Sequence, residues 1–226
     1  MPDAGHPLQE SGITFLGGKL MTVASRTLAR EAVKTLKHRK SVAKLTVKQV
    51  VDLRRAFEAV LPINDERGYN YHAGIHGLPL PMYCEHGTLL FLPWHRAYLY
   101  FFELALRDRV KTVSLPWWNW ASAGSRRNGI PKTYAAQSVD GTANPLFSAP
   151  IPPVARVSGR PRESFRRPRD PSLLPTQQDV QDVLDEPDFR GFSDKVEVLH
   201  NGVHVWIGGT TAQVPWAAYD PLFWTH

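Results

Sequence analysis

Apolar residues recur every three to four positions in residues 45–61, which is the spacing of one face of an α-helix. Thr46 stands where it can cap the N-terminus of this helix. The apolar positions of the stretch are Val50, Leu53, Phe57 and Val60. The pattern predicts a helix with one buried face.

Further stretches carry the same helical period. One runs from Trp94 to about Arg109, and another covers residues 196–209, where two glycines end it. Two weaker patterns add a helix over residues 26–39 and a short one over residues 179–189. The core is therefore predicted to be helical.

The remaining stretches lack a clear period. Residues 121–180 are rich in Pro, Gly, Ser and Arg, which predicts long loops over the helical core and no second domain. Residues 1–24 read as an arm with a short strand at residues 13–15. We expect a mainly α fold, with a helical core, long irregular loops and few short strands, in a single domain over residues 1–226.

Composition supports a packed chain. It is 42% hydrophobic over 226 residues and carries 7 Trp, 7 Tyr and 10 Phe, enough for a sizeable core. Cys84 is the single cysteine, which excludes an internal disulfide framework and a thiolate metal cluster. We see no signal peptide and no apolar run near membrane-spanning length, so we expect no membrane partner. A cytoplasmic location is the default, with export left open.

The net charge of +6 raises the question of nucleic-acid binding. Arginines gather in residues 155–170, but Phe165 is the one aromatic residue there that could stack on a base. This stretch is rich in proline and is interpreted as a solvated loop. No specific nucleic-acid partner is expected.

Histidines carry the candidate chemistry. Seven of the nine fall into three groups, with His72, His76, His86 and His95 in the first, His200 and His204 in the second, and His226 in the third. A helix stacks the second pair on one face, because the two residues are four positions apart. Two buried imidazoles without partners are costly, and a shared metal ion satisfies both.

The choice of metal follows from what surrounds these histidines. Imidazole-only ligation suits copper, zinc, iron or nickel. The HExxH arrangement of zinc proteases is absent, and carboxylates for a bridged di-iron site are few near the histidines: Glu85, Glu103, Glu197 and Asp220. Two metal ions, each held by about three imidazoles, are the best interpretation, with copper as the natural occupant.

Two motifs resemble the copper signatures of tyrosinases, catechol oxidases and molluscan haemocyanins. "HGTLLFLPWHRAYLYFFE" is similar to the first signature, in which His is followed by Phe, an aromatic-His-Arg triplet and Glu. "LHNGVHVWIGG" followed by "DPLFW" resembles the second. The resemblance implies a helical bundle around a dicopper centre.

The same resemblance implies the ligands of each copper. One copper is held by His76, His86 and His95, and His72 competes with His76 for the first place. The other copper is held by His200 and His204 and by a sixth ligand that strict counting puts one residue beyond His226. His226 is either the neighbour of that ligand or the ligand itself. The helix that normally follows is also missing, so the chain is expected to be incomplete or processed.

Cys84 stands two residues before His86, as in fungal enzymes and molluscan haemocyanins that join these two residues by a thioether bond. The resemblance therefore implies a Cys84–His86 crosslink that fixes the imidazole. The alternative is that Cys84 is a small buried hydrophobic residue.

The implied function is a type 3 copper oxidase that hydroxylates monophenols to o-diphenols and oxidises o-diphenols to o-quinones with O2. In similar enzymes a Glu before the first ligand of the second copper and an Asn after it order a water that deprotonates the phenol, and Glu197 and Asn201 match these places. Val205 is small and leaves room for an aromatic ring. The alternatives are an o-aminophenol oxidase, a catechol oxidase without monophenolase activity, and an oxygen-carrying haemocyanin-like unit. The oligomeric state stays open.

Overall fold

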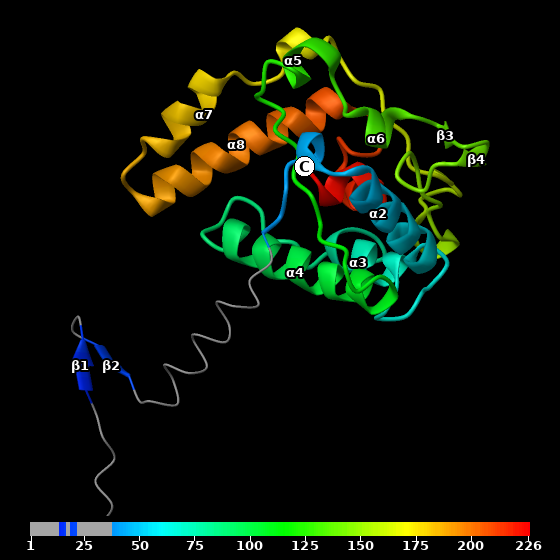
Figure 1. The fold of residues 1–226 in the computed structure, drawn as a ribbon, viewed down its shortest axis with the longest axis horizontal. Coiled ribbons are helices and arrows are strands. Elements are labelled where there is room, and N and C mark those ends of the chain that lie inside the picture. Colours follow the sequence, from blue (N-terminus) through cyan, green and yellow to red (C-terminus); the bar gives the residue numbers. More distant parts are fainter. Residues whose placement is uncertain (1–13, 17–18, 22–37) are drawn as a thin grey trace, which may run out of the picture. The chain divides into compact units, whose positions relative to one another are not determined.

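The structure is a computed structural model that describes residues 14–16, 19–21 and 38–226, in two compact units, Met1–His38 and Arg39–His226. In the first unit, strands β1 (Thr14–Leu16) and β2 (Lys19–Met21) pair antiparallel, with Leu16 opposite Lys19 (Figure 1). The predicted strand is thus found one residue further along the chain. The predicted helix over residues 26–39 falls almost entirely outside the described residues.

Four helices build the second unit: α2 (Val47–Val60), α3 (Tyr69–His76), α4 (Phe91–Arg109) and α8 (Phe189–Ile207) (Figure 1). Helix α4 packs against both α2 and α8. The prediction of a mainly α fold with long loops and few short strands is confirmed. Among the described residues, no helix is long and apolar enough to cross a membrane.

Short elements punctuate the loops. The helical ones are α5 (Ser125–Asn128), α6 (Lys132–Ala135), α7 (Gln177–Leu184) and α9 (Val214–Ala217). A small hairpin joins β3 (Ser138–Val139) to β4 (Thr142–Ala143). Single 3-10 turns lie at Val42–Lys44, Pro153–Ala155, Pro171–Leu173 and Pro221–Trp224.

Two helix boundaries differ from the prediction. Helix α4 begins at Phe91, because Pro93 lies in its first turn, where a missing N–H costs nothing. Helix α8 begins at Phe189, which the sequence pattern had placed in the preceding helix. Asp188 caps α8 by accepting a hydrogen bond from the Gly191 N–H at 2.9 Å.

Helix α3 is a further element that the pattern did not predict. It has eight residues and lies between Gly68 and Gly77. Both glycines allow close packing, because an added Cβ would lie 2.2 Å from the carbonyl oxygen of Ile63 at Gly68 and of Pro215 at Gly77. A helix this short depends on tertiary contacts, which a sequence pattern does not contain.

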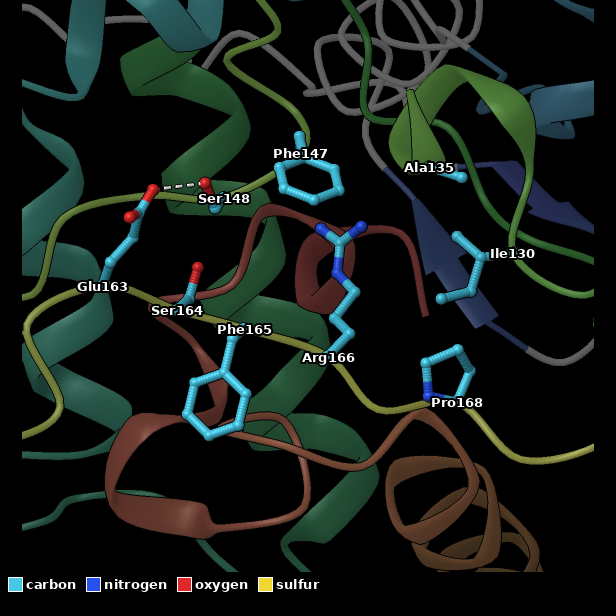
Figure 2. A pocket seen from close by; sticks show the side chains of 9 residues that line it. All are labelled: Ile130, Ala135, Phe147, Ser148, Glu163, Ser164, Phe165, Arg166 and Pro168. Carbon is cyan, nitrogen blue, oxygen red and sulfur yellow. Dashed lines mark hydrogen bonds between the residues drawn. The ribbon is translucent and has the colours of Figure 1, made fainter. Parts of the chain in front are cut away.

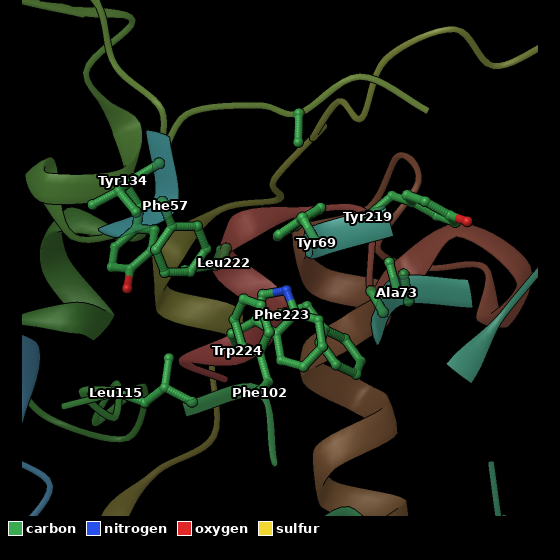
Figure 3. Packing of buried hydrophobic residues seen from close by; sticks show 14 of the residues in the cluster. Phe57, Tyr69, Ala73, Phe102, Leu115, Tyr134, Tyr219, Leu222, Phe223 and Trp224 are labelled. Atoms are coloured by element: carbon green, nitrogen blue, oxygen red, sulfur yellow. The ribbon is translucent and has the colours of Figure 1, made fainter. Parts of the chain in front are cut away.

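Aromatic side chains fill the core between these helices (Figure 3). Phe102 of α4 stacks on Trp224 with ring centroids 3.7 Å apart, and it meets Phe57 of α2 and Tyr69 of α3 at 5.7 and 5.8 Å. Residues near the C-terminus are therefore part of the core. This packing holds the segment before His226 in place.

Arg166 of the arginine-rich loop lines a pocket beside Phe147 (Figure 2), and its guanidinium also holds the C-terminal segment in place. Its guanidinium donates to both carboxylate oxygens of Asp220 at 2.6–2.9 Å and to the carbonyls of Tyr134 and Leu146 at 2.7 and 3.1 Å. Only 6% of the Arg166 side chain is exposed. The interpretation of this stretch as a solvated loop is therefore wrong for Arg166. We call Arg166 and Asp220 together the Arg166–Asp220 pair.

Candidate dicopper centre

Three histidines from different elements form the first histidine cluster. His76 ends α3, His86 lies in the loop before α4, and His95 lies in the second turn of α4. Their ring centroids are 5.5 Å apart for His76–His86 and His76–His95, and 5.2 Å apart for His86–His95. The three predicted ligands of the first copper thus meet.

The second histidine cluster joins the pair on α8 to the end of the chain. Ring centroids are 4.5 Å apart for His200–His204, 4.3 Å for His200–His226 and 4.5 Å for His204–His226. One ligand atom of each of these residues lies within 4.8 Å of the others. His226 therefore lies where it can complete a three-imidazole site.

Hydrogen bonds to backbone carbonyls set the orientation of two rings. His95 Nδ1 lies 2.8 Å from the Phe91 carbonyl oxygen, and His204 Nδ1 lies 2.9 Å from that of Thr211. In each ring Nε2 then points away from the anchor and is available to a metal ion. The Thr211 anchor had no signal in the sequence.

Phenylalanines form walls that the two clusters share. Phe91 lies 4.7 Å from the His95 ring and 5.5 Å from the His200 ring. Phe223 lies 4.7 Å from His76 and 6.0 Å from His204. The clusters are therefore neighbours in an apolar setting, since each phenylalanine contacts a histidine of both.

Burial favours the neutral form of His76, His95, His200, His204 and His226. It lowers the pKa of His95 and of His204 to about 4 and places the pKa values of His76, His200 and His226 well below the usual range. Neutral imidazole is the form that binds a metal ion.

Several ring nitrogens in the clusters are buried and lack a hydrogen-bond partner within the described part of the chain: His76 Nδ1, His86 Nε2, His95 Nε2 and His226 Nδ1. His200 Nε2 and His204 Nε2 face each other at 2.9 Å. Unsatisfied buried nitrogens are costly, and a metal ion in each cluster would satisfy them. The donor set fits two copper ions.

His72 lies outside both clusters. It is buried one turn before His76 on α3, where its ring contacts Phe102 at 5.4 Å and Tyr71 at 5.7 Å. Burial also lowers its pKa. The geometry groups His76, and not its competitor His72, with the other ligands.

Cys84 lies at the edge of the first cluster. Its sulfur and one nitrogen each of His76 and His86 all lie within 4.8 Å of one another. The thiol is partly buried, and burial raises its pKa. This proximity is compatible with a bond to His86.

Glu197, Asn201 and Val205 follow one another at single-turn spacing along α8. Glu197 is buried, with 6% exposed, and its carboxylate accepts a hydrogen bond from the Gly87 N–H. Asn201 is exposed, and Val205 is 46% exposed. Glu197 therefore faces the loop that carries His86.

A family model, the common central domain of tyrosinase, matches residues 66–226. The chain belongs to the tyrosinase family of type 3 copper proteins. Haemocyanin 2 of Megathura crenulata is 31% identical over 210 residues, covering 83% of this chain and 6% of that protein. The tyrosinase of Streptomyces glaucescens is 33% identical over 168 residues, covering 62% of this chain and 59% of that protein.

Solved structures of this family share the fold. A functional unit of octopus haemocyanin superposes with a TM-score of 0.72 at 27% identity, over 84% of this chain and 50% of that one. The Burkholderia thailandensis tyrosinase gives 0.73 at 21% identity, over 84% and 59%. This chain thus spans less than two thirds of the relatives it matches, and they include both tyrosinases and haemocyanins.

Proposed function

We propose that Arg39–His226 forms the catalytic domain of a copper oxidase that hydroxylates monophenols to o-diphenols and oxidises o-diphenols to o-quinones with O2. The observation that carries the proposal is the pair of adjacent histidine clusters, each with three imidazole rings close together and with buried, unpartnered ring nitrogens. His76, His86 and His95 would hold one copper, and His200, His204 and His226 the other. Bound copper supplies the redox chemistry toward O2 and the phenol.

The protein itself supplies neutral ligands and apolar walls. The lowered pKa values keep His95 and His204 unprotonated at pH 7, so protons do not compete with copper at these two rings. Phe91 and Phe223 place apolar rings beside both clusters. An apolar boundary of this kind limits side reactions of reactive oxygen species and quinones.

The phenol needs a base, because its pKa near 10 leaves little phenolate at pH 7. We assign this role to a water ordered by Glu197 and Asn201, which lie one turn apart on α8. The Glu197 carboxylate accepts the Gly87 N–H and keeps further lone pairs for water. Asn201 is exposed to solvent and lies directly after His200.

Access for a ring is the observation that favours an enzyme over an oxygen carrier. Val205, next to His204, is small and 46% exposed, which supports an open approach for a phenol along α8. The alternatives are an o-aminophenol oxidase or a catechol oxidase without monophenolase activity, which would use the same ligands. A haemocyanin-like oxygen carrier is the alternative suggested by the similarity to haemocyanin 2.

A thioether between Cys84 and His86 is part of the proposal. The S–C bond would replace the thiol S–H and one ring C–H, and two electrons and two protons would pass to O2 to give hydrogen peroxide. Intact-mass measurement of copper-matured protein should show a loss of two hydrogens, located to the peptide that holds both residues. A Cys84 that is freely alkylated in active protein would disprove the bond.

The decisive experiment compares substrates on the copper-loaded full chain. Copper analysis should find close to two ions per chain, and tyrosine, catechol and an o-aminophenol are then tested side by side. Turnover of tyrosine supports the full proposal, whereas turnover of catechol or o-aminophenol alone assigns one of the narrower oxidases. Reversible O2 binding without turnover of any of the three would identify a carrier.

A further inference from the structure

His86 is anchored differently from the other ligands whose Nδ1 contacts an oxygen. His95 and His204 use backbone carbonyls, which have no charge. His86 Nδ1 instead lies 3.3 Å from the Glu197 Oε1 atom. Among the described contacts of the six cluster histidines, this is the one carboxylate facing a ring nitrogen.

Glu197 is itself held in place by the same loop. The Gly87 N–H donates to both of its carboxylate oxygens at 2.9 Å, across a separation of 110 residues. The carboxylate is buried and comes from α8, three residues before His200. One side chain therefore links the loop of the first cluster to the helix of the second.

We infer that Glu197 is a positioning residue for His86. Its carboxylate takes the Nδ1–H of the imidazole, which fixes the tautomer and directs Nε2 into the first cluster. In this tautomer Nε2 carries no proton and can bind a metal ion. His86 Nε2 is buried and has no hydrogen-bond partner among the described residues, which agrees with such a role. The metal-binding part of this inference rests on the proposed copper centre. The tautomer of His86 does not depend on that proposal, because it follows from the contact with Glu197.

The physical consequence is a stronger ligand. A carboxylate behind an imidazole holds the ring in one orientation, and loss of such a partner typically costs about 10–100-fold in metal affinity. Glu197 also contributes to the first copper from the helix that carries ligands of the second. This role is separate from ordering a substrate water.

The test reads the His86 tautomer directly in the metal-free full chain, by long-range ¹⁵N–¹H correlation of the imidazole nitrogens. We expect the Nδ1–H form in the parent protein. Glu197→Gln replaces the acceptor with an amide that can donate to Nδ1, so the Nε2–H form should increase. Glu85→Gln is the matched control, since Glu85 precedes His86 in the same loop and accepts from Thr88 instead.

An Nε2–H tautomer in the parent, or equal shifts in both variants, would overturn the inference. The parent spectrum needs no variant, so the test survives a misfolded Glu197→Gln protein. Copper titration is the second measurement, in which Glu197→Gln should weaken first-site binding about 10–100-fold and Asn201→Ala should not. If copper fails to bind the parent while the tautomer is as expected, the proposed function fails and the positioning role stands.

Discussion

The two histidine clusters use the same donor groups but are assembled differently. In the second cluster, His200 and His204 meet because they are four positions apart on one helix. In the first cluster, each histidine comes from a different element, and none of the three spacings brings a pair together locally. Local geometry therefore builds most of the second cluster, and tertiary contacts build all of the first.

The loop before α4 shows how many long-range contacts the first cluster needs. The Leu78 N–H donates to the Pro215 carbonyl at 3.0 Å, and the Leu78 carbonyl accepts from the Tyr219 hydroxyl at 2.6 Å. Further along, the Tyr83 N–H donates to the Ile75 carbonyl at 3.1 Å. Before it reaches His86, the loop is therefore hydrogen-bonded both to α3 and to the segment near the C-terminus.

His226 is the exception within the second cluster. It comes from a segment that the Arg166–Asp220 pair and the Phe102–Trp224 stack hold in place. The second cluster thus combines a local pair with one distant ligand. Variants that act on one kind of contact at a time distinguish the two ways of assembling a cluster.

Removing one member of the local pair should have the largest effect. We expect His200→Ala to lose the copper of the second cluster, leaving about one ion per chain, and to abolish nearly all oxidase turnover, because a two-metal site works as a unit. Copper analysis and catechol turnover measure this. His72→Ala is the control and should keep both ions, since His72 lies outside the clusters; a His200→Ala protein with full copper would refute the assignment.

Next in size is the effect of Asn201→Ala on monophenols. General-base assistance is worth roughly 10²–10⁴-fold, so tyrosine turnover should fall by a factor in that range. Catechol turnover should change much less, because a catechol depends less on an added base. The two rates are compared at equal copper content, and equal losses on both substrates would show that Asn201 supports the fold instead.

Arg166→Met should weaken the distant contact that holds His226. It leaves the buried Asp220 carboxylate without its ion-pair partner, which typically costs about 3–5 kcal/mol in the free energy of unfolding. Urea unfolding measures this loss. Arg167→Met removes an exposed arginine that lies over the Phe165 ring, and it should cost less than about 1 kcal/mol. Similar losses in both variants would mean that Arg166 has no special role.

A further expected effect is a pH dependence of the stability of the metal-free protein. Folding lowers the pKa of His95 and His204 from 6.5 to about 4, so the unfolded state binds more protons between these values. The free energy of unfolding should therefore fall as pH drops from 6.5 toward 4, by up to about 1.4 kcal/mol per pH unit for each group. Urea unfolding at several pH values measures the slope. A flat profile would mean that the two rings are not buried as described.

Features that depend on neighbours along the chain can be predicted from the sequence alone. The helical period predicted α2 and the central parts of α4 and α8, and the His200–His204 spacing predicted a shared metal. The two copper motifs predicted the family, which the family model confirms. Each of these signals lies within one helix or one short motif, so it can be recognised without knowing the fold.

The remaining features of the fold and of the site depend on contacts between segments that are far apart in the sequence. Helix α3 ends just before Gly77, which packs on the distant carbonyl of Pro215, and Arg166 of the arginine-rich loop pairs with a carboxylate 54 residues away. Glu197 meets the loop of His86 across 110 residues. Burial and pairing of this kind arise only when separate segments pack together, because no local pattern records which distant group will satisfy a charge or a ring nitrogen.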